Sequence, residues 1–330
     1  MNKIFRKLTA VTFSALIATA AFTSCDTKED EMINQQTITL TVGSNGTFTA
    51  VAPAENPAST DWKVFAGANY VFFFDFVNNS CSIGVTDLKV DDSTTPLTFT
   101  MNNLPQSRET DENVRGVDTA GPVAFQGPDG RTHVVKDIRP ACLRDPERYF
   151  DNANSPVPTF FMSFILDDTQ IKVMPNNEIY FGTTRSHNLS NTSETYENTT
   201  AKYLVTFNMY DPTTNSFNPS RLTADISILY PSFSPGMPDF KFPLIFPEVP
   251  FTLNENGCTF AATTLTPKMQ MTANSPITDV EIFPITDLSA TMVYEKSFNL
   301  SFDCISKLPK VGSWHVDAET TPFALKKASN

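Results

Sequence analysis

The sequence predicts an all-β protein, and three observations support that prediction. Apolar residues recur at every second position in several segments, as in strands that bury one face and expose the other. Helical patterning is scarce along the whole chain. The 28 phenylalanines exceed what a disordered chain would contain, so a packed core is expected.

Two alternating runs come first, "TITLTV" (37–42) and "TFTAV" (47–51), separated by "GSNG". Asn-Gly between alternating apolar runs is the strongest short-range signal for a tight β-hairpin. The sequence therefore predicts a hairpin over 37–51.

Further strands are predicted along the rest of the chain. "YVFFFDF" (70–76) is apolar on both faces and indicates a central strand, and alternation returns at 97–101, 222–230 and 298–304. The segment 230–251 contains six prolines among its aromatic residues. Proline lacks the amide proton that a sheet ladder needs, so this segment is expected to be a long loop or an edge.

A polar stretch, "SHNLSNTSETYENTT" (186–200), has Leu189 as its only aliphatic residue and indicates a boundary between domains. The predicted organisation is a first β domain over 37–185, a polar linker over 186–201 and a second β domain over 202–330. Both domains are expected to be β-sandwiches of the immunoglobulin-like or transthyretin-like kind.

The two halves show an internal similarity. Shifting the numbering by 127 aligns 130–140 with 257–267 and 159–173 with 286–300 without a gap. This favours an internal duplication, with coincidence as the alternative because alternating sequences match one another easily. A duplication would leave about twenty extra residues within 105–129 of the first half. Long loops on a regular scaffold are common binding sites.

The first 24 residues have the layout of a secretory signal. Lys3, Arg6 and Lys7 precede an uncharged run, 8–22, which is shorter than the ~20 residues that a membrane-spanning helix needs. Two kinds of processing fit: cleavage after a small residue of the run, or cleavage before Cys25 with acylation of its thiol.

Small residues before Cys25 and the acidic "DTKEDE" after it resemble a bacterial lipoprotein precursor. The acidic stretch is similar to the export signal of surface lipoproteins in the Bacteroidota. The resemblance covers about thirty residues and implies lipidation of Cys25, with palmitate among the acyl groups. It further implies a flexible tether over 25–36 and a body held on the outer membrane, facing the cell exterior. Stable anchoring takes two or more acyl chains, as lipoproteins supply.

Charge and composition argue against nucleic acid as a partner. Removal of residues 1–24 lowers the formal net charge from −12 to −15, and no basic patch is present in the sequence. Nucleic-acid binding depends on clustered Lys and Arg. The acidity is instead expected to belong to a solvated surface.

Four cysteines remain after Cys25, namely Cys81, Cys142, Cys258 and Cys304. An even number in an exported protein permits disulfides, and pairing Cys81 with Cys142 and Cys258 with Cys304 would keep each bond within one half. Buried free thiols are the alternative. No C-x-x-C occurs, so no zinc site is predicted, and neither a metal nor a cofactor is expected.

Catalytic motifs are absent from the sequence. The histidines are His133, His187 and His315, and neither H-E-x-x-H nor G-x-S-x-G occurs. We therefore predict a protein that is not an enzyme. The alternative is a hydrolase whose carboxylates converge from distant loops.

Aromatic residues are the candidates for ligand contact, since exposed rings can stack on sugars or on a partner protein; core packing is the alternative. These candidates are Trp62, Phe233, Phe240, Phe242 and Trp314. Two D-[ST]-x triplets, at 92–94 and 118–120, resemble the O-glycosylation motif of exported Bacteroidota proteins and make Ser93 and Thr119 candidate attachment sites.

The leading functional hypothesis is non-catalytic binding of a glycan or an envelope protein at the cell surface. A fimbrial or other structural subunit is the second hypothesis. Fimbrillins of the same phylum are lipoprotein precursors that mature after an arginine. Here the first arginine beyond Cys25 is Arg108, inside the predicted first domain, which weakens that hypothesis.

Overall fold

The computed structural model describes residues 37–55, 62–92, 95–106, 114–116, 121–143, 160–237, 240–294 and 296–321. The predicted signal and tether, Cys25, Ser93 and Thr119 lie outside these residues. The described part contains twenty-two strands and no α-helix, which confirms the all-β prediction. No helix in it has the length and apolar character needed to cross a bilayer.

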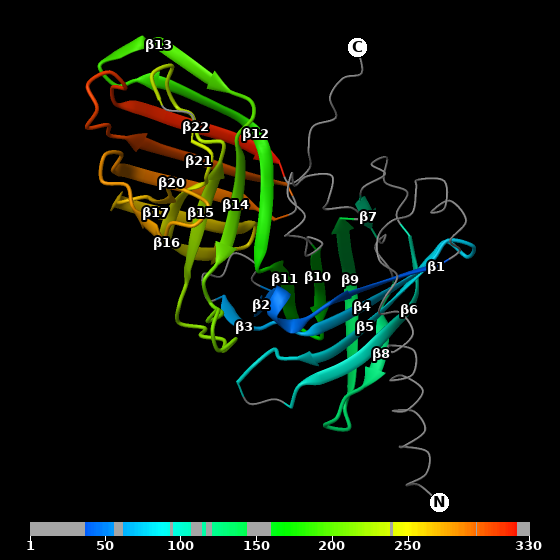
Figure 1. Ribbon diagram of the computed structural model, residues 1–330. Coiled ribbons are helices and arrows are strands. Elements are labelled where there is room, and N and C mark those ends of the chain that lie inside the picture. Colours follow the sequence, from blue (N-terminus) through cyan, green and yellow to red (C-terminus); the bar gives the residue numbers. More distant parts are fainter. Residues whose placement is uncertain are drawn as a thin grey trace, which may run out of the picture.

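The first half consists of two antiparallel sheets that share one core (Figure 1). One sheet has the order β1 (Thr37–Val42), β4 (Asn69–Asp75), β5 (Ser80–Leu88) and β6 (Leu97–Pro105). The other has the order β3 (Lys63–Ala66), β2 (Thr47–Pro53), β11 (Thr169–Pro175), β10 (Phe160–Leu166), β9 (Thr132–Leu143) and β7 (Val114–Gly116), with β8 (Val123–Gln126) also on β9. Phe72 and Phe160 meet between the sheets with ring centroids 4.8 Å apart.

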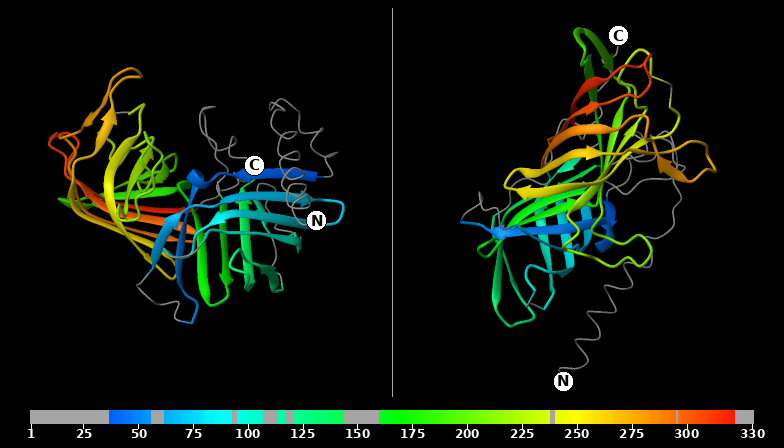
Figure 2. Two further views of the ribbon diagram at one scale, coloured as in Figure 1. Left: turned by 90° about the horizontal axis from the view of Figure 1, so that it is seen from below. Right: turned by 90° about the vertical axis from the view of Figure 1, so that its left-hand side faces the viewer.

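The second half is a closed antiparallel barrel around a packed apolar interior (Figure 2). In sequence order its eight strands are β12 (Asn177–Asn188), β14 (Lys202–Phe207), β15 (Thr223–Leu229), β16 (Leu244–Asn254), β17 (Gly257–Leu265), β20 (Ile285–Val293), β21 (Ser297–Cys304) and β22 (Trp314–Thr321). The ring closes because β12 pairs with β22 and β15 pairs with β16. The second sandwich was therefore a wrong prediction. Alternating burial is the same in a barrel as in a sandwich, so the pattern does not separate them.

Three shorter strands extend the barrel wall. β13 (Asn191–Asn198) pairs with β12, and β18 (Lys268–Gln270) forms a hairpin with β19 (Ile277–Asp279) beside β16. The predicted linker 186–201 is therefore not a linker, since it contains the end of β12 and the whole of β13. Its side chains are polar because this hairpin exposes most of β13 to solvent.

The predicted hairpin over 37–51 does not form. A short 3-10 turn, Ser44–Gly46, separates β1 and β2, but β1 pairs with β4 and β2 pairs with β11 in the other sheet. Six consecutive residues of β2 are buried, which means that both of its faces are covered. This burial favours a central layer for β2 over pairing with β1 in the outer sheet.

The proline-rich segment is a loop only in its first part. Residues 244–254 form β16, which has strands on both edges. Pro247 lies at the register shift between β15 and β16, next to Glu248 with φ 52°. A bulge tolerates proline because it needs no ladder donor there, so the expected loop or edge was wrong for this strand.

The shift of 127 equates β9, β10 and β11 with β17, β20 and β21, and each set is a run of antiparallel neighbours. In the barrel, the other edge of β17 pairs with β16. In the first half, the corresponding edge of β9 pairs with β7 and β8, and both of these strands lie within 105–129, the segment predicted to contain the insertion. The extra strands occupy the edge that closes the barrel, so the first half stays open. The duplication itself remains a prediction.

The two halves pack against each other. Phe48 of β2 lies in the barrel core, 4.9 Å from the ring of Phe207. The Tyr210 hydroxyl accepts a hydrogen bond from the Gly67 amide (2.8 Å) and donates to the Ser44 carbonyl (2.7 Å). These contacts join the central sheet to one end of the barrel.

Cys258 and Cys304 are buried free thiols, so of the two alternatives left open by the sequence, the structure shows the free thiols and not the disulfide for this pair. The two cysteines lie on strands that flank β20. Cys258 of β17 is paired with Met292 of β20, and Cys304 of β21 is paired with Ile285, near the other end of β20. Seven residues of strand separate these positions by roughly 23 Å, far beyond disulfide reach. Cys81 is buried in β5, and the side chain of Cys142, its possible disulfide partner, lies outside the described residues.

Candidate functional site

A cleft of about 360 Å³ lies between β13 and the loop that follows β15. Its walls are two tyrosines, four other polar residues, two prolines and a methionine. They are Tyr196, Asn198, Thr200, Tyr230, Pro231, Ser232, Ser234, Pro235 and Met237. The volume falls at the lower end of the range for small-molecule sites, and the mixture of rings with a few polar groups is typical of them.

Tyr230 begins the loop in an unusual backbone conformation. Its φ is 56°, in the left-handed region that bulky side chains rarely adopt, and its side chain is 44% exposed. Pro231 and Pro235 cannot donate to a ladder, so the chain leaves the barrel wall here. Backbone outliers of this kind occur often at binding sites, where surrounding contacts hold them.

Asn198 holds the loop against β13. Its side-chain amide donates to the carbonyls of Tyr230 (3.0 Å) and Ser232 (3.4 Å). Its carbonyl oxygen accepts from the amide and the hydroxyl of Thr200, at 2.9 and 2.8 Å. The Tyr196 hydroxyl lies 2.9 Å from the Ser232 hydroxyl. The cleft is therefore shaped before any ligand arrives.

Ser234 gives the cleft a polar group with unused bonding capacity. The residue is 1% exposed, and its hydroxyl has no hydrogen-bond partner within the described part of the chain. A buried hydroxyl without a partner costs about 1–3 kcal/mol, and most buried polar side chains avoid that cost. A ligand hydroxyl or carboxylate in the cleft would supply the missing partner.

The aromatic residues predicted from sequence do not form this site. Phe233 lies in the same loop, but its ring packs in the barrel core, 5.3 Å from Phe302. Trp314 is 2% exposed, and its indole N–H donates to the Val311 carbonyl at 2.7 Å. Both were wrong as ligand-contacting candidates, because the barrel interior takes their rings.

The other three candidates lie elsewhere. Phe240 and Phe242 are half-buried against the barrel core. Trp62 lies at the junction of the halves, where the Lys172 ammonium is 4.6 Å from its ring centroid. Lys172 also donates to the carbonyl oxygens of Asn254 and Glu255, and burial lowers the pKa of its ammonium. Trp62 thus belongs to a contact between the halves.

His133 sits in a structural clamp at the edge of the first half. Its Nδ1 lies 2.8 Å from an Asp167 oxygen and its Nε2 lies 3.2 Å from an Asp129 oxygen. The hydrogen bond to Asp167 raises the pKa of His133. The second oxygen of Asp167 accepts from the Val134 amide at 2.9 Å. The clamp ties two turns together and includes no nucleophile.

The remaining histidines are neighbours on the outer face of the barrel. His187 of β12 is opposite His315 of β22, with ring centroids 5.0 Å apart, and His315 Nδ1 lies 2.6 Å from Asp303. Within the described residues, no group of three or more His, Cys, Asp or Glu side chains is arranged to hold a metal ion.

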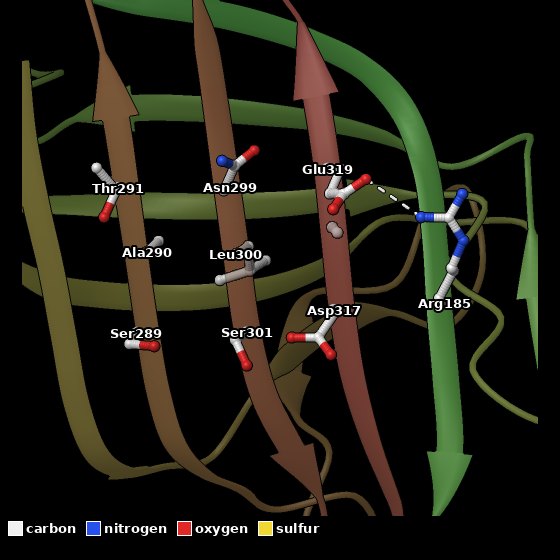
Figure 3. A pocket seen from close by; sticks show the side chains of 10 residues that line it. Arg185, Ser289, Ala290, Thr291, Asn299, Leu300, Ser301, Asp317 and Glu319 are labelled. Carbon is white, nitrogen blue, oxygen red and sulfur yellow. Dashed lines mark hydrogen bonds and ion pairs between the residues drawn. The ribbon is translucent and has the colours of Figure 1, made fainter.

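A second, open depression of about 420 Å³ lies on this outer face (Figure 3). Short polar side chains of β20 and β21 form its floor, among them Ser289, Asn299 and Ser301. On one side Arg185 donates to Glu319 at 3.2 Å. The residues that line this depression include no aromatic ring, and none of them has a buried hydroxyl that lacks a partner. The tyrosine cleft is therefore the better candidate site.

Comparisons with known proteins do not assign the chain to a family. No protein-family model matches it, and no curated protein matches it. Among solved structures it is similar to the isotype 1 transferrin binding protein B from serogroup B Neisseria meningitidis, with 10% identity and a TM-score of 0.22. That alignment covers 87% of this chain and 77% of the other. A TM-score this low supports no conclusion about fold or function.

Sequence reasoning missed Tyr196 and Ser234 and named the wrong rings of the loop. Tyr196 stood in the segment interpreted as a linker. Two signals in the sequence could have pointed to the cleft. Tyr196 is the one aromatic ring of the polar stretch 186–200 apart from a histidine, and Tyr230 stands directly before a proline.

Proposed function

We propose that the chain is a cell-surface lipoprotein, anchored through Cys25, that binds a glycan in the tyrosine cleft and catalyses no reaction on it. The signal, the cysteine and the acidic stretch support the location. One observation supports the binding role most directly: two tyrosines line a pre-formed cleft whose buried Ser234 hydroxyl has no hydrogen-bond partner among the described residues.

The chemistry of the cleft suits a sugar. A pyranose ring presents an apolar face that can pack on an aromatic ring, and tyrosine combines such a face with a polar end. The sugar's hydroxyl groups can pair with Ser234, which has bonding capacity left. Because Asn198 fixes the loop beforehand, little ordering entropy would be lost on binding.

The test is a glycan array with the purified mature chain, followed by titration of each hit. We expect Tyr230→Ala to weaken binding at least tenfold, or about 1.4 kcal/mol. Phe73→Ala is the matched control, because Phe73 is 41% exposed on β4 in the other half. Equal losses in both variants would contradict the proposed site.

Ser234→Ala separates binding from folding. Because this buried hydroxyl has no partner within the part of the chain that the structure describes, its removal should leave the free energy of unfolding unchanged or slightly higher. Binding should nevertheless fall, because the sugar loses its hydrogen bond. An array without hits for the folded protein would contradict the proposed function as a whole.

A further inference from the structure

We propose that His187 and His315 form a binding site for a divalent late transition-metal ion, such as Zn²⁺ or Cu²⁺, on the seam that closes the barrel. The inference does not depend on the proposed glycan binding. The two histidines lie far apart in the sequence, and the pairing of β12 with β22 makes them neighbours.

The two imidazoles share the outer face of the barrel. They occupy directly opposite positions on adjacent antiparallel strands, so their side chains point to the same side of the sheet. The neighbouring residues Ser186 and Val316 are buried, which places both histidines on the face away from the core. Apart from its contact with the His315 ring, the His187 ring forms no hydrogen bond with any residue that the structure describes.

The spacing of the two rings fits one shared metal ion. The ring centroids lie 5.0 Å apart, with an interplanar angle of 40°. Two imidazoles on one tetrahedral zinc ion, at metal–nitrogen distances of ~2.0–2.1 Å, also have their centroids about 5 Å apart. The pair therefore needs little rearrangement to chelate an ion, and water molecules would complete the coordination of this two-residue site.

Two carboxylates support His315 as a ligand. Its Nδ1 lies 2.6 Å from Asp303, which is directly opposite on β21. Metal-binding histidines usually donate one ring N–H to a carboxylate, and this bond selects the tautomer whose other nitrogen can coordinate. That nitrogen, Nε2, lies 3.3 Å from an oxygen of Asp317 and 3.3 Å from the Ser301 hydroxyl. The Asp317 carboxylate would attract a cation bound at Nε2.

The ligands and their surroundings determine the class of ion. Imidazole nitrogen suits zinc, copper and nickel, whereas calcium and magnesium take oxygen ligands. Arg185, the cation nearest to Asp317 along the seam, is already paired with Glu197 at 3.4 Å and with Glu319 at 3.2 Å. Asp317 lies at one end of the open depression, so the metal site would border it (Figure 3).

The first test is equilibrium dialysis of the purified mature chain, without an affinity tag, against Zn²⁺. We expect one tightly bound zinc ion per chain, and His187→Asn and His315→Asn should each weaken its binding at least tenfold. His133→Asn is the matched control and should leave the zinc affinity unchanged, because His133 lies on β9 in the first half. An excess of Ca²⁺ should not displace the zinc. Thermal unfolding verifies that every variant is folded.

Electron paramagnetic resonance of the Cu²⁺-loaded chain counts the imidazole ligands directly. The wild type should show coupling of the copper to two nitrogen atoms, and each single histidine variant to one at most. Zinc should also raise the urea midpoint of the wild type, because an ion that binds the folded pair stabilises the folded state. The midpoint of His187→Asn should not move.

Equal zinc affinity in the wild type and in both histidine variants would show that the ion binds elsewhere, and would overturn the inference. Failure of the folded wild type to bind either zinc or copper would overturn it as well. Neither result would affect the glycan proposal, which is tested separately with Tyr230→Ala.

Discussion

Tyr230 shows how much of the candidate site can be predicted from the sequence at the scale of single residues. The sequence offers two interpretations of the proline- and aromatic-rich segment 230–251, exposed rings or rings packed in the core, and the first residues of this segment line the cleft. It does not reveal which ring points outward, because a loop has no periodicity to separate a buried position from an exposed one. Phe233, three residues on, packs in the core, while Tyr230 takes a left-handed φ and faces solvent.

His133 should make the stability of the first half depend on pH. Its pKa is raised in the folded protein by Asp167 and, less strongly, by Asp129. The stabilisation is therefore complete below the unfolded pKa of about 6.5 and is lost as the pH rises through the raised folded value. The hydrogen bond with Arg131 lowers the pKa of Asp129, which stays ionised throughout this window.

We expect urea denaturation midpoints of the wild type and His133→Asn to differ most near pH 5.5 and to approach each other near pH 8.5. His187→Asn is the control, because His187 lies on β12 of the barrel and is not part of the clamp that Asp129 and Asp167 form with His133. If the difference between the two urea midpoints grew as the pH rose, the clamp would not stabilise the protonated form of His133.

At the scale of elements, alternation identified strands reliably but not their partners. The residues of β15 and β21 alternate between buried and more exposed, as predicted. Pairing depends on contacts distant in sequence, and the Asn-Gly signal at 45–46 was overridden by the burial of β2 on both faces. The same limitation hid β13, whose polarity resembles that of a linker.

Gly182 permits the seam between β12 and β22 that closes the barrel. A Cβ at this position would collide with the backbone of Glu319 and Thr320. We expect Gly182→Ala to lower the free energy of unfolding by about 1–3 kcal/mol, the range for overpacking a close contact. The measurement is chemical denaturation followed by tryptophan fluorescence.

Gly84→Ala is the matched control on β5, where a Cβ would meet Val71 at 3.9 Å, an ordinary van der Waals distance. It should be neutral or slightly stabilising, because alanine restricts the unfolded chain more than glycine. If both substitutions lowered the free energy of unfolding by a similar amount, the contact between β12 and β22 at Gly182 would not be unusually close.

At the scale of the whole molecule, the structure stacks three layers: an outer sheet, a central sheet and a barrel. Length predicted two units, but the junction lies at Asn176, between β11 and β12, and not in the segment 186–201. The barrel could not be predicted, because its closure requires β12 to meet β22, about 130 residues later in the chain.

The membrane anchor is a prediction at the same scale. Metabolic labelling with a fatty-acid analogue should mark the wild-type chain and not Cys25→Ala, which should be recovered in the soluble fraction because the acyl chains supply the membrane affinity. Cys258→Ala is the control, since Cys258 is a buried thiol. Persistent label in Cys25→Ala would refute the anchor.

The position of β1 has a mechanical consequence. β1 follows the predicted tether directly and is held by a ladder to β4, while β2 continues into the layer that contacts the barrel. If drag from flowing liquid acts on the barrel of an anchored molecule, the load enters through Thr37. It must then shear the β1–β4 ladder before it reaches the cleft. Strands loaded in shear break many hydrogen bonds together, so the cleft would keep its shape under forces that had already stretched the tether.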